Sequence, residues 1–323
     1  MKKASAVIVA AGSGSRMKLP QKKQFLELCG KPVWAWSVAA FESCPRIGEI
    51  VLVVPPEDVE LCEREVLDAR LGGPEDRASA DEQGRQPVFI RVVAGGEDRQ
   101  KSVYRGIAAT DAKYGIVAVH DGVRALIEPG ILDRAIGAAE KYGAACVAVP
   151  VTDTIKQVAS HEGGAACVAV PVTDTIERTE GHNCGVACAA ETVDGAIKRT
   201  SSHEGGAASE EKCLKASTVK KSGNGDDSFN CNGFIESTID RRNLWAAQTP
   251  QVFNRDTVLK ALEAAEGSGY SVTDESSLIE ITGGKVAIVM GSYENIKITS
   301  QTDLSIAEYI LRDRLSRLGR NNA

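Results

Sequence analysis

The first half of the chain alternates short apolar runs with stretches of helical spacing. The apolar runs are rich in Val and Ile and are apolar on both faces, as expected of buried parallel strands. They span Ser5–Ala10, Ile50–Val54, Val88–Val93, Ile116–His120 and Ala145–Val151. Between them, the spacing predicts helices over Pro32–Glu42, Lys101–Ala112 and Pro129–Tyr142. This alternation predicts an α/β fold in which a mostly parallel, twisted sheet carries helices on both faces.

The last third of the chain returns to a regular pattern after two irregular regions. The first region, Gly72–Gln86, is polar and predicts a surface insertion. A regular pattern of apolar and polar residues resumes near Phe234, after the second irregular region. From there the pattern predicts a segment that crosses back toward the domain, then a helix, a strand and a closing helix. These are Leu244–Phe253, Arg255–Glu266, Val286–Met290 and Leu304–Leu315.

The second irregular region contains an internal repeat. Residues 145–155 recur without change at 166–176, and Ser160–Ala166 recurs at Ser202–Ala208. Two copies are too few for a solenoid. We therefore expect one domain built from residues 1–156 and 234–323, with 157–233 as an insertion that is extended or partly disordered. The first copy follows the helix Pro129–Tyr142 directly, so we place that copy in the sheet.

Composition narrows the function classes. The chain has 323 residues, a net charge of -6 and 43% hydrophobic residues, which suits one large or two small globular domains. A mildly acidic protein is not a general nucleic-acid binder, so we expect no nucleic-acid partner. No apolar run is long enough to span a membrane, and the first one continues into Gly12–Arg16, which favours a buried strand over a signal peptide. We expect a cytoplasmic protein with no membrane partner.

The nine cysteines do not make a convincing metal site. Cys184 and Cys188 lie near His182 in sequence, and Cys213 and Cys231 follow, but no Cys-x-x-Cys pair is present. Without a secretory signal, reduced thiols are expected. We assign no residue as a metal ligand.

A glycine-rich segment with two cations follows the first strand. Gly12 and Gly14 let the backbone turn and bring its N–H groups against phosphate oxygens. Arg16 and Lys23 add positive charge suited to a triphosphate and to a pyrophosphate leaving group. The pattern lacks the third glycine of the dinucleotide fingerprint, since Met17 stands there, and it lacks the Gly-Lys-Ser/Thr of a Walker motif.

Four further segments carry candidate chemistry. Gly95–Ser102 opens a helix, where glycines and N–H groups suit a ribose or phosphate, although a plain capped helix start has the same pattern. His120–Arg124 follows the fourth strand at the edge where ligands bind in such sheets. Asp121 could orient a hydroxyl or hold Mg²⁺ through water, Arg124 could bind a phosphate, and His120 is interpreted as a packed strand-end residue. Arg241, Arg242 and Lys297 are cations that could join Arg124 in a phosphate pocket.

Taken together, these segments resemble the 2-C-methyl-D-erythritol 4-phosphate cytidylyltransferase family of the non-mevalonate isoprenoid pathway. The resemblance covers most of residues 4–156 and 234–312. Eight motifs in the family's order carry it: A-A-G-S-G-S-R-M, K-Q-F, G-G-E-D-R-x-x-S, H-D-G-V-R, P-V-T-D-T-I-K, D-R-R-N-L-W-A-A-Q-T-P-Q, V-T-D-E-S-S and G-S-Y-E-N-I-K-I-T.

The resemblance implies a Rossmann-like nucleotidyltransferase fold and a homodimer joined by a projecting β-arm. The substrate phosphate would attack the α-phosphorus of CTP, with Mg²⁺ carried on the triphosphate and pyrophosphate as the leaving group. The residues implied as catalytic are Arg16, Lys23, Arg241 and Lys297. Those implied for CTP are Ala10, Ala11, Gly12, Gly14, Gly96, Glu97 and Ser102, to which we add Arg99 and Gly122. Those implied for methylerythritol phosphate are Asp121, Arg124, Thr154, Arg241, Thr249 and Lys297.

The sequence also departs from the family pattern. Ala125 stands where the family usually has Pro, and Lys22 precedes Lys23 where one lysine is expected; we choose Lys23 because Gln-Phe follows it. The repeat gives Thr154 a rival in Thr175, and Lys156 after the first copy favours Thr154. The insertion falls in the arm that completes the partner's active site in the family, which leaves the dimer geometry open.

Three other functions were weighed for the same sequence. A cytidylyltransferase for ribitol 5-phosphate or another polyol phosphate shares most of these motifs, and a sugar-1-phosphate uridylyl- or thymidylyltransferase fits less well. A non-catalytic nucleotide-binding or interaction protein could keep the fold while the arm diverged. The cations at Arg16, Lys23 and Lys297 favour an enzyme.

Overall fold

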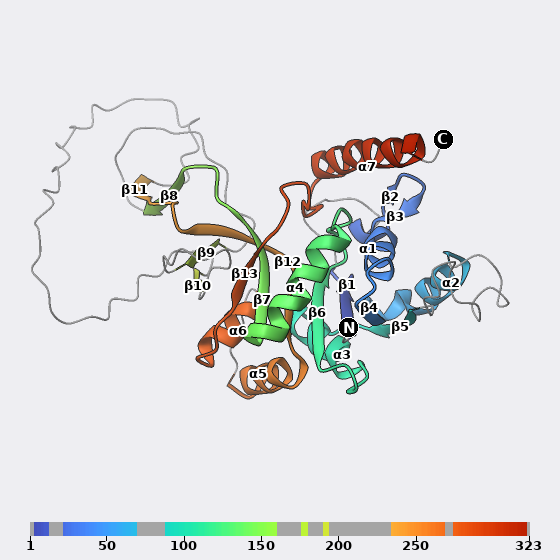
Figure 1. Ribbon diagram of the computed structural model, residues 1–323, viewed down its shortest axis with the longest axis horizontal. Helices are drawn as coiled ribbons and strands as arrows, with labels where there is room; N and C mark the ends of the chain where they lie inside the picture. Colours follow the sequence, from blue (N-terminus) through green and yellow to red (C-terminus); the bar gives the residue numbers. More distant parts are fainter. Residues whose placement is uncertain are drawn as a thin grey trace, which may run out of the picture.

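A sheet of Val- and Ile-rich strands forms the centre of the molecule (Figure 1). The computed structural model describes residues 3–12, 22–69, 88–159, 176–179, 190–193, 234–268 and 274–321. Its main strands lie in the order β5 (Phe89–Ala94), β4 (Ile47–Val54), β1 (Ala4–Val9), β6 (Ile116–Asp121), β12 (Leu244–Asn254), β7 (Ala144–Pro150) and β13 (Ala287–Met290). All neighbours pair in parallel except at β12, which is antiparallel to both β6 and β7. The predicted α/β fold with a mostly parallel sheet is confirmed.

Helices cover both faces of this sheet because successive strand residues point to opposite sides. Ile8 and Leu52 face a layer formed by α1 (Val33–Glu42), α2 (Val59–Ala69) and α4 (Pro129–Tyr142). Val7 and Val53 face the opposite layer, formed by α3 (Arg99–Ala108), α5 (Arg255–Ser268) and α6 (Glu275–Ile281). Two 3₁₀ turns, η2 (Lys23–Phe25) and η3 (Pro56–Asp58), and the short pair β2 (Glu27–Leu28) and β3 (Lys31–Pro32) complete the first half.

The C-terminal helix α7 (Gln301–Asn321) packs beside the loops that follow β6 and β13. Its Ala307 and Leu311 join a buried cluster with Leu126 and Ile298. Arg314 adds polar contacts, since it donates to the Leu126 carbonyl at 2.9 Å and to Glu294 Oε2 at 2.6 Å. The helix therefore packs against both loops and stabilises their position in the domain.

Strand β12 is the main difference from the sequence prediction, which treated Leu244–Phe253 as a crossing segment. The strand pattern is broken where the polar residues Gln248 and Thr249 precede Pro250, and the register with β7 shifts between Ala247 and Gln251. Gln248 and Thr249 are nevertheless buried. Their side chains form hydrogen bonds inside the protein, as described below. The polar residues of this segment therefore do not mark a surface position.

The observed helix boundaries also differ from the predicted ones. The third helix, expected over Lys101–Ala112, occupies Arg99–Ala108 because Asp98 caps it and accepts a hydrogen bond from the Lys101 N–H at 2.7 Å. Helices α2 and α6 were not predicted. α6 is only seven residues long and begins with four buried polar residues, Asp274 to Ser277, counting its cap.

The first copy of the repeat forms β7 in the sheet, as expected. The chain then leaves the sheet as β8 (Ile155–Ala159), which pairs with β11 (Phe234–Ile239), and this pair projects from the domain (Figure 1). The second copy ends in β9 (Ile176–Thr179), which pairs with the start of β12 and with β10 (Ala190–Val193). The other residues of the predicted insertion, and Gly72–Gln86, lie outside the described residues.

Among the residues that the structure describes, no helix combines the length and apolarity needed to cross a bilayer. That same part of the chain contains no group of three His, Cys, Asp or Glu residues placed to hold a metal ion. The cysteines that the sequence analysis weighed as a metal site lie outside the described residues: Cys184, Cys188, Cys213 and Cys231.

Candidate active site

Asp121 stands at the centre of a charged cluster at the carboxyl end of β6. Its Oδ2 lies 2.9 Å from Lys297 Nζ, and its Oδ1 lies 3.3 Å from an Arg99 terminal nitrogen. Arg124 Nε is 4.0 Å from Oδ2. Burial alone would raise the pKa of Asp121, but Lys297, Arg99 and Arg124 together hold that pKa well below its usual value. The carboxylate is therefore ionised and flanked by cations.

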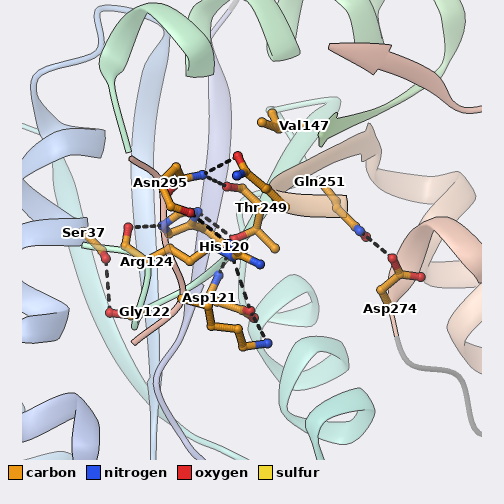
Figure 2. Close-up of polar contacts among 12 residues, drawn as sticks. Ser37, His120, Asp121, Gly122, Arg124, Val147, Thr249, Gln251, Asp274 and Asn295 are labelled. Atoms are coloured by element: carbon orange, nitrogen blue, oxygen red, sulfur yellow. Dashed lines mark hydrogen bonds and ion pairs between the residues drawn. The ribbon is translucent and has the colours of Figure 1, made fainter. Parts of the chain in front are cut away.

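His120 and Thr249 fix the backbone that carries Asp121 (Figure 2). The Asp121 N–H donates to Thr249 Oγ1 at 3.0 Å, and the same hydroxyl lies 3.0 Å from His120 Nδ1. His120 Nε2 lies 3.1 Å from the Arg124 carbonyl. A carbonyl only accepts, so Nε2 carries the proton, Nδ1 accepts, and the Thr249 hydroxyl donates.

His120 is thus a structural residue, as the sequence suggested. It is 0% exposed and its ring packs against Phe41 with 4.9 Å between centroids. Burial lowers the pKa of His120 to about 4, so the imidazole is neutral at physiological pH. Both its ring nitrogens have partners in the protein, which leaves His120 no role as a base.

Arg124 and Asn295 connect β6 to the segment after β13. Arg124 is 3% exposed and donates from NH1 to the Asn295 carbonyl at 2.9 Å. Asn295 is 0% exposed and its amide donates to the Thr249 carbonyl at 3.0 Å and to Gln248 Oε1 at 3.2 Å (Figure 2). Because Lys297 lies two residues further on, these bonds place its ammonium beside Asp121.

Arg99 lies on the other side of Asp121, in the first turn of α3. Its guanidinium donates to both carboxylate oxygens of Glu275, at 2.5 and 3.1 Å, as well as to Asp121. Glu275 is 1% exposed. The sequence prediction placed Arg99 among the CTP contacts, whereas here its guanidinium is directed to two carboxylates.

Small residues line the neighbouring strand ends. The Gly122 N–H donates to the Val9 carbonyl at 2.8 Å, and a side chain at Gly122 would crowd Ala10, with a Cβ only 3.1 Å from the alanine Cβ. Similarly, a Cβ at Gly95 would overlap the side chain of Ala11. Glycine at these two positions therefore lets the strand ends pack closely against Ala10 and Ala11.

Ser102 and Glu97 flank the start of α3. Ser102 is buried; its Oγ accepts from the Gly96 N–H at 3.0 Å and donates to the Asp98 carbonyl at 2.7 Å. Glu97 is exposed and forms an ion pair with Lys101 at 2.6 Å. The hydroxyl of Ser102 thus holds the glycine turn in place.

The glycine-rich segment leaves the described residues after Gly12 and re-enters at Lys22, so Gly14 and Arg16 lie outside them. The described residues on either side of this gap lie close together, because the buried Gln24 amide donates to the Gly12 carbonyl at 2.9 Å. Lys22 forms ion pairs with Glu57 at 2.5 Å and Asp58 at 2.6 Å. Lys23, the next residue, begins η2 and is half-buried.

Thr154 and Arg241 lie apart from this cluster. Both are exposed and stand at the base of the projecting pair, where Thr154 precedes β8 and Arg241 follows β11 (Figure 1). Arg242, beside Arg241, is paired with Asp240 at 2.5 Å. The structure therefore brings together Asp121, Arg124, Thr249 and Lys297 but leaves these two predicted substrate residues on the arm. Thr175 lies outside the described residues.

Sequence reasoning missed Glu275, Asn295 and Gln251 as parts of this site. Glu275 and Asn295 stood in motifs used for the resemblance, V-T-D-E-S-S and G-S-Y-E-N-I-K, but had no role assigned. Their place in these motifs was the available signal, and it was not used.

Comparison with known proteins decides the family. The family model described as IspD, 2-C-methyl-D-erythritol 4-phosphate cytidylyltransferase, matches residues 4–163 and 218–313, which is most of the chain. The chain belongs to this cytidylyltransferase family. The unmatched stretch 164–217 lies within the predicted insertion.

Individual relatives of the cytidylyltransferase family cover nearly the whole chain. The 2-C-methyl-D-erythritol 4-phosphate cytidylyltransferase of Caldanaerobacter subterraneus subsp. tengcongensis is 35% identical over 308 residues, covering 95% of this chain and 98% of the relative. That of Pelotomaculum thermopropionicum is 32% identical, covering 98% of each. The crystal structure of 4-diphosphocytidyl-2C-methyl-D-erythritol synthase from Anaerococcus prevotii shares the fold, with a TM-score of 0.62, 24% identity and 96% of each chain covered.

Proposed function

We propose that this chain is a nucleotidyltransferase that joins CTP to 2-C-methyl-D-erythritol 4-phosphate, releasing pyrophosphate and 4-diphosphocytidyl-2-C-methyl-D-erythritol for isoprenoid precursor synthesis. Family membership supports the reaction. The observation that carries it at the site is the ionised Asp121 between Lys297 and Arg99, beside the small-residue edge at Gly122.

The charges of the cluster fit a polyol phosphate. Asp121 would accept a hydrogen bond from a substrate hydroxyl, while Lys297 and Arg124 would attract the phosphate. A phosphate oxygen would attack the α-phosphorus of CTP, forming one P–O bond as the bond to the β-phosphate bridging oxygen breaks. No protein nucleophile is needed, since the enzyme supplies orientation and positive charge.

The small-residue edge fits the nucleotide. In this proposal the base and ribose lie against the ends of β1, β5 and β6, and Arg16 and Lys23 stabilise the charge that develops on the triphosphate. Arg99 and Thr249 act on the Asp121 side instead, because their polar atoms bond to or hold Asp121. The proposed nucleotide contacts are Ala10, Ala11, Gly12, Gly14, Gly96, Glu97, Ser102 and Gly122.

Mg²⁺ enters this proposal as part of the substrate, bound to the triphosphate of CTP. Asp121, the acidic side chain at the centre of the described cluster, already contacts Lys297 and Arg99, so its carboxylate is not vacant for a resident metal. The ion would neutralise charge on the leaving pyrophosphate.

A cytoplasmic location remains a prediction.

The function is tested by pyrophosphate release with CTP, Mg²⁺ and 2-C-methyl-D-erythritol 4-phosphate, run beside ribitol 5-phosphate. We expect release with the first polyol phosphate and little with the second, because the family defines the first as substrate. Release with ribitol 5-phosphate alone would keep the fold and reaction type but change the substrate. A folded sample that releases pyrophosphate with neither would point to a non-catalytic relative.

We also propose a homodimer in which the arm of one copy completes the site of the other. The position of Arg241 and Thr154 at the base of the projecting β8–β11 pair, away from Asp121, supports it. Co-expressed Lys23→Ala and Arg241→Ala chains are then expected to regain about a quarter of wild-type activity, because half of the dimers are mixed and each mixed dimer has one intact site. Neither variant alone would show this activity, and no recovery on mixing would contradict a shared site.

A further inference from the structure

Glu275 is a buried carboxylate to which the proposed reaction gives no part. It is the first residue of α6 and is 1% exposed. Its two oxygens accept hydrogen bonds from Arg99 at 2.5 and 3.1 Å. Burial raises the pKa of Glu275, and Arg99 opposes that shift. A carboxylate is costly to bury, and a well-packed apolar pair would stabilise the fold at least as well.

The start of α6, which carries Glu275, is held in place by hydrogen bonds of the neighbouring residues. Asp274 caps α6, accepting from the Ser277 N–H at 3.1 Å. The Gln251 amide connects β12 to this turn, because it donates to Asp274 Oδ2 at 2.7 Å (Figure 2). Its oxygen also accepts from the Ser276 N–H at 3.0 Å. The start of α6 is thus attached to the central sheet, so Glu275 gives Arg99 a fixed partner.

Arg99 also bonds Asp121. The nitrogen that bonds Glu275 Oε2 also lies 3.3 Å from Asp121 Oδ1, while Lys297 contacts the other oxygen, Oδ2. The result is a row of alternating charge, Glu275, Arg99, Asp121 and Lys297, that joins α6, α3, β6 and the segment after β13.

The geometry shows what Glu275 prevents. A guanidinium with no second carboxylate tends to bind a carboxylate through two parallel bonds. If Glu275 did not hold it, Arg99 would turn both terminal nitrogens to Asp121 and compete for Oδ2 with Lys297 and with a substrate hydroxyl. Glu275 therefore restricts Arg99 to one oxygen of Asp121.

We infer that Glu275 is a positioning residue for the polyol phosphate: it holds Arg99 so that one oxygen of Asp121 stays available to Lys297 and the substrate. This inference rests on the proposed function. It concerns the second substrate only, because Glu275 bonds Arg99, and Arg99 in turn bonds Asp121, the residue assigned to the polyol phosphate.

The test is Glu275→Gln, which keeps the shape of the side chain and removes its charge. We expect the KM for 2-C-methyl-D-erythritol 4-phosphate to rise about tenfold while the KM for CTP changes less than about twofold. The matched control is Glu49→Gln. Glu49 is also buried, at 4% exposure, and bonds Ser5 and the Asp111 N–H away from this site, so its loss should lower stability and leave both KM values unchanged.

A double-mutant cycle with Arg99→Gln shows whether Glu275 acts through Arg99. In the Arg99→Gln background, Glu275→Gln should leave the KM for the polyol phosphate unchanged, and this comparison also serves if the single Glu275→Gln protein does not fold. Additive effects, an equal rise in both KM values, or the same rise in Glu49→Gln would overturn the inference. An inactive wild type would instead count against the proposed function.

Discussion

Replacing Lys23 with alanine is expected to lower kcat by about 100-fold or more, with a much smaller effect on the KM for the polyol phosphate. A cation aimed at charge that develops on phosphorus acts in the transition state more than in the ground state. The buried Gln24 amide bonds the Gly12 carbonyl and so ties Lys23 to the start of the glycine-rich segment. Steady-state kinetics with both substrates varied would measure the effect.

Lys22→Ala is the matched control, since it removes the same charge one residue away. Lys22 is already paired with Glu57 and Asp58, and partly exposed pairs of this kind contribute about 1 kcal/mol or less to stability. Its kcat should stay near that of the wild type. If Lys22→Ala lost activity and Lys23→Ala kept it, the assignment of the two lysines would be reversed.

The strands and the position of Asp121 at a strand end could be predicted from sequence because both depend on local pattern. Runs such as Ile116–His120 are apolar on both faces, and the residue after such a run falls at the carboxyl edge of the sheet, which placed Asp121 correctly at the end of β6. The first copy of the repeat was placed in the sheet for an equally local reason, since it follows α4 directly.

What could not be predicted depends on long-range pairing of polar groups. Thr249 and Asn295 are polar by type but lie in the core, because each bonds a backbone group far away in sequence. The same holds for Glu275, whose partner Arg99 is 176 residues distant. A one-dimensional pattern records that such residues are polar but not that their partners are buried with them, so β12 and α6 were missed.

Asp121→Asn is expected to lower kcat/KM for the polyol phosphate by about 100-fold, equivalent to about 3 kcal/mol of lost charge-assisted bonding. The amide keeps the size of the side chain, and the backbone bond from Asp121 to Thr249 is unaffected. An uncharged group cannot hold both Lys297 and Arg99, so the ammonium and the substrate hydroxyl lose their common partner. The KM for CTP should change little, and an equal loss for both substrates would contradict this division of the site.

The same variant has a pH signature. Because the pKa of folded Asp121 is held well below the usual value, the ionised side chain adds stability that is fully present above the unfolded pKa of about 3.9 and is lost as the pH falls through the folded pKa. The difference in free energy of unfolding between wild type and Asp121→Asn should therefore be constant from about pH 5 to pH 8 and shrink below about pH 4. Denaturant unfolding at several pH values would measure it. A difference that does not vary down to the lowest pH at which both proteins fold would mean that Asp121 is not the stabilised anion of this cluster.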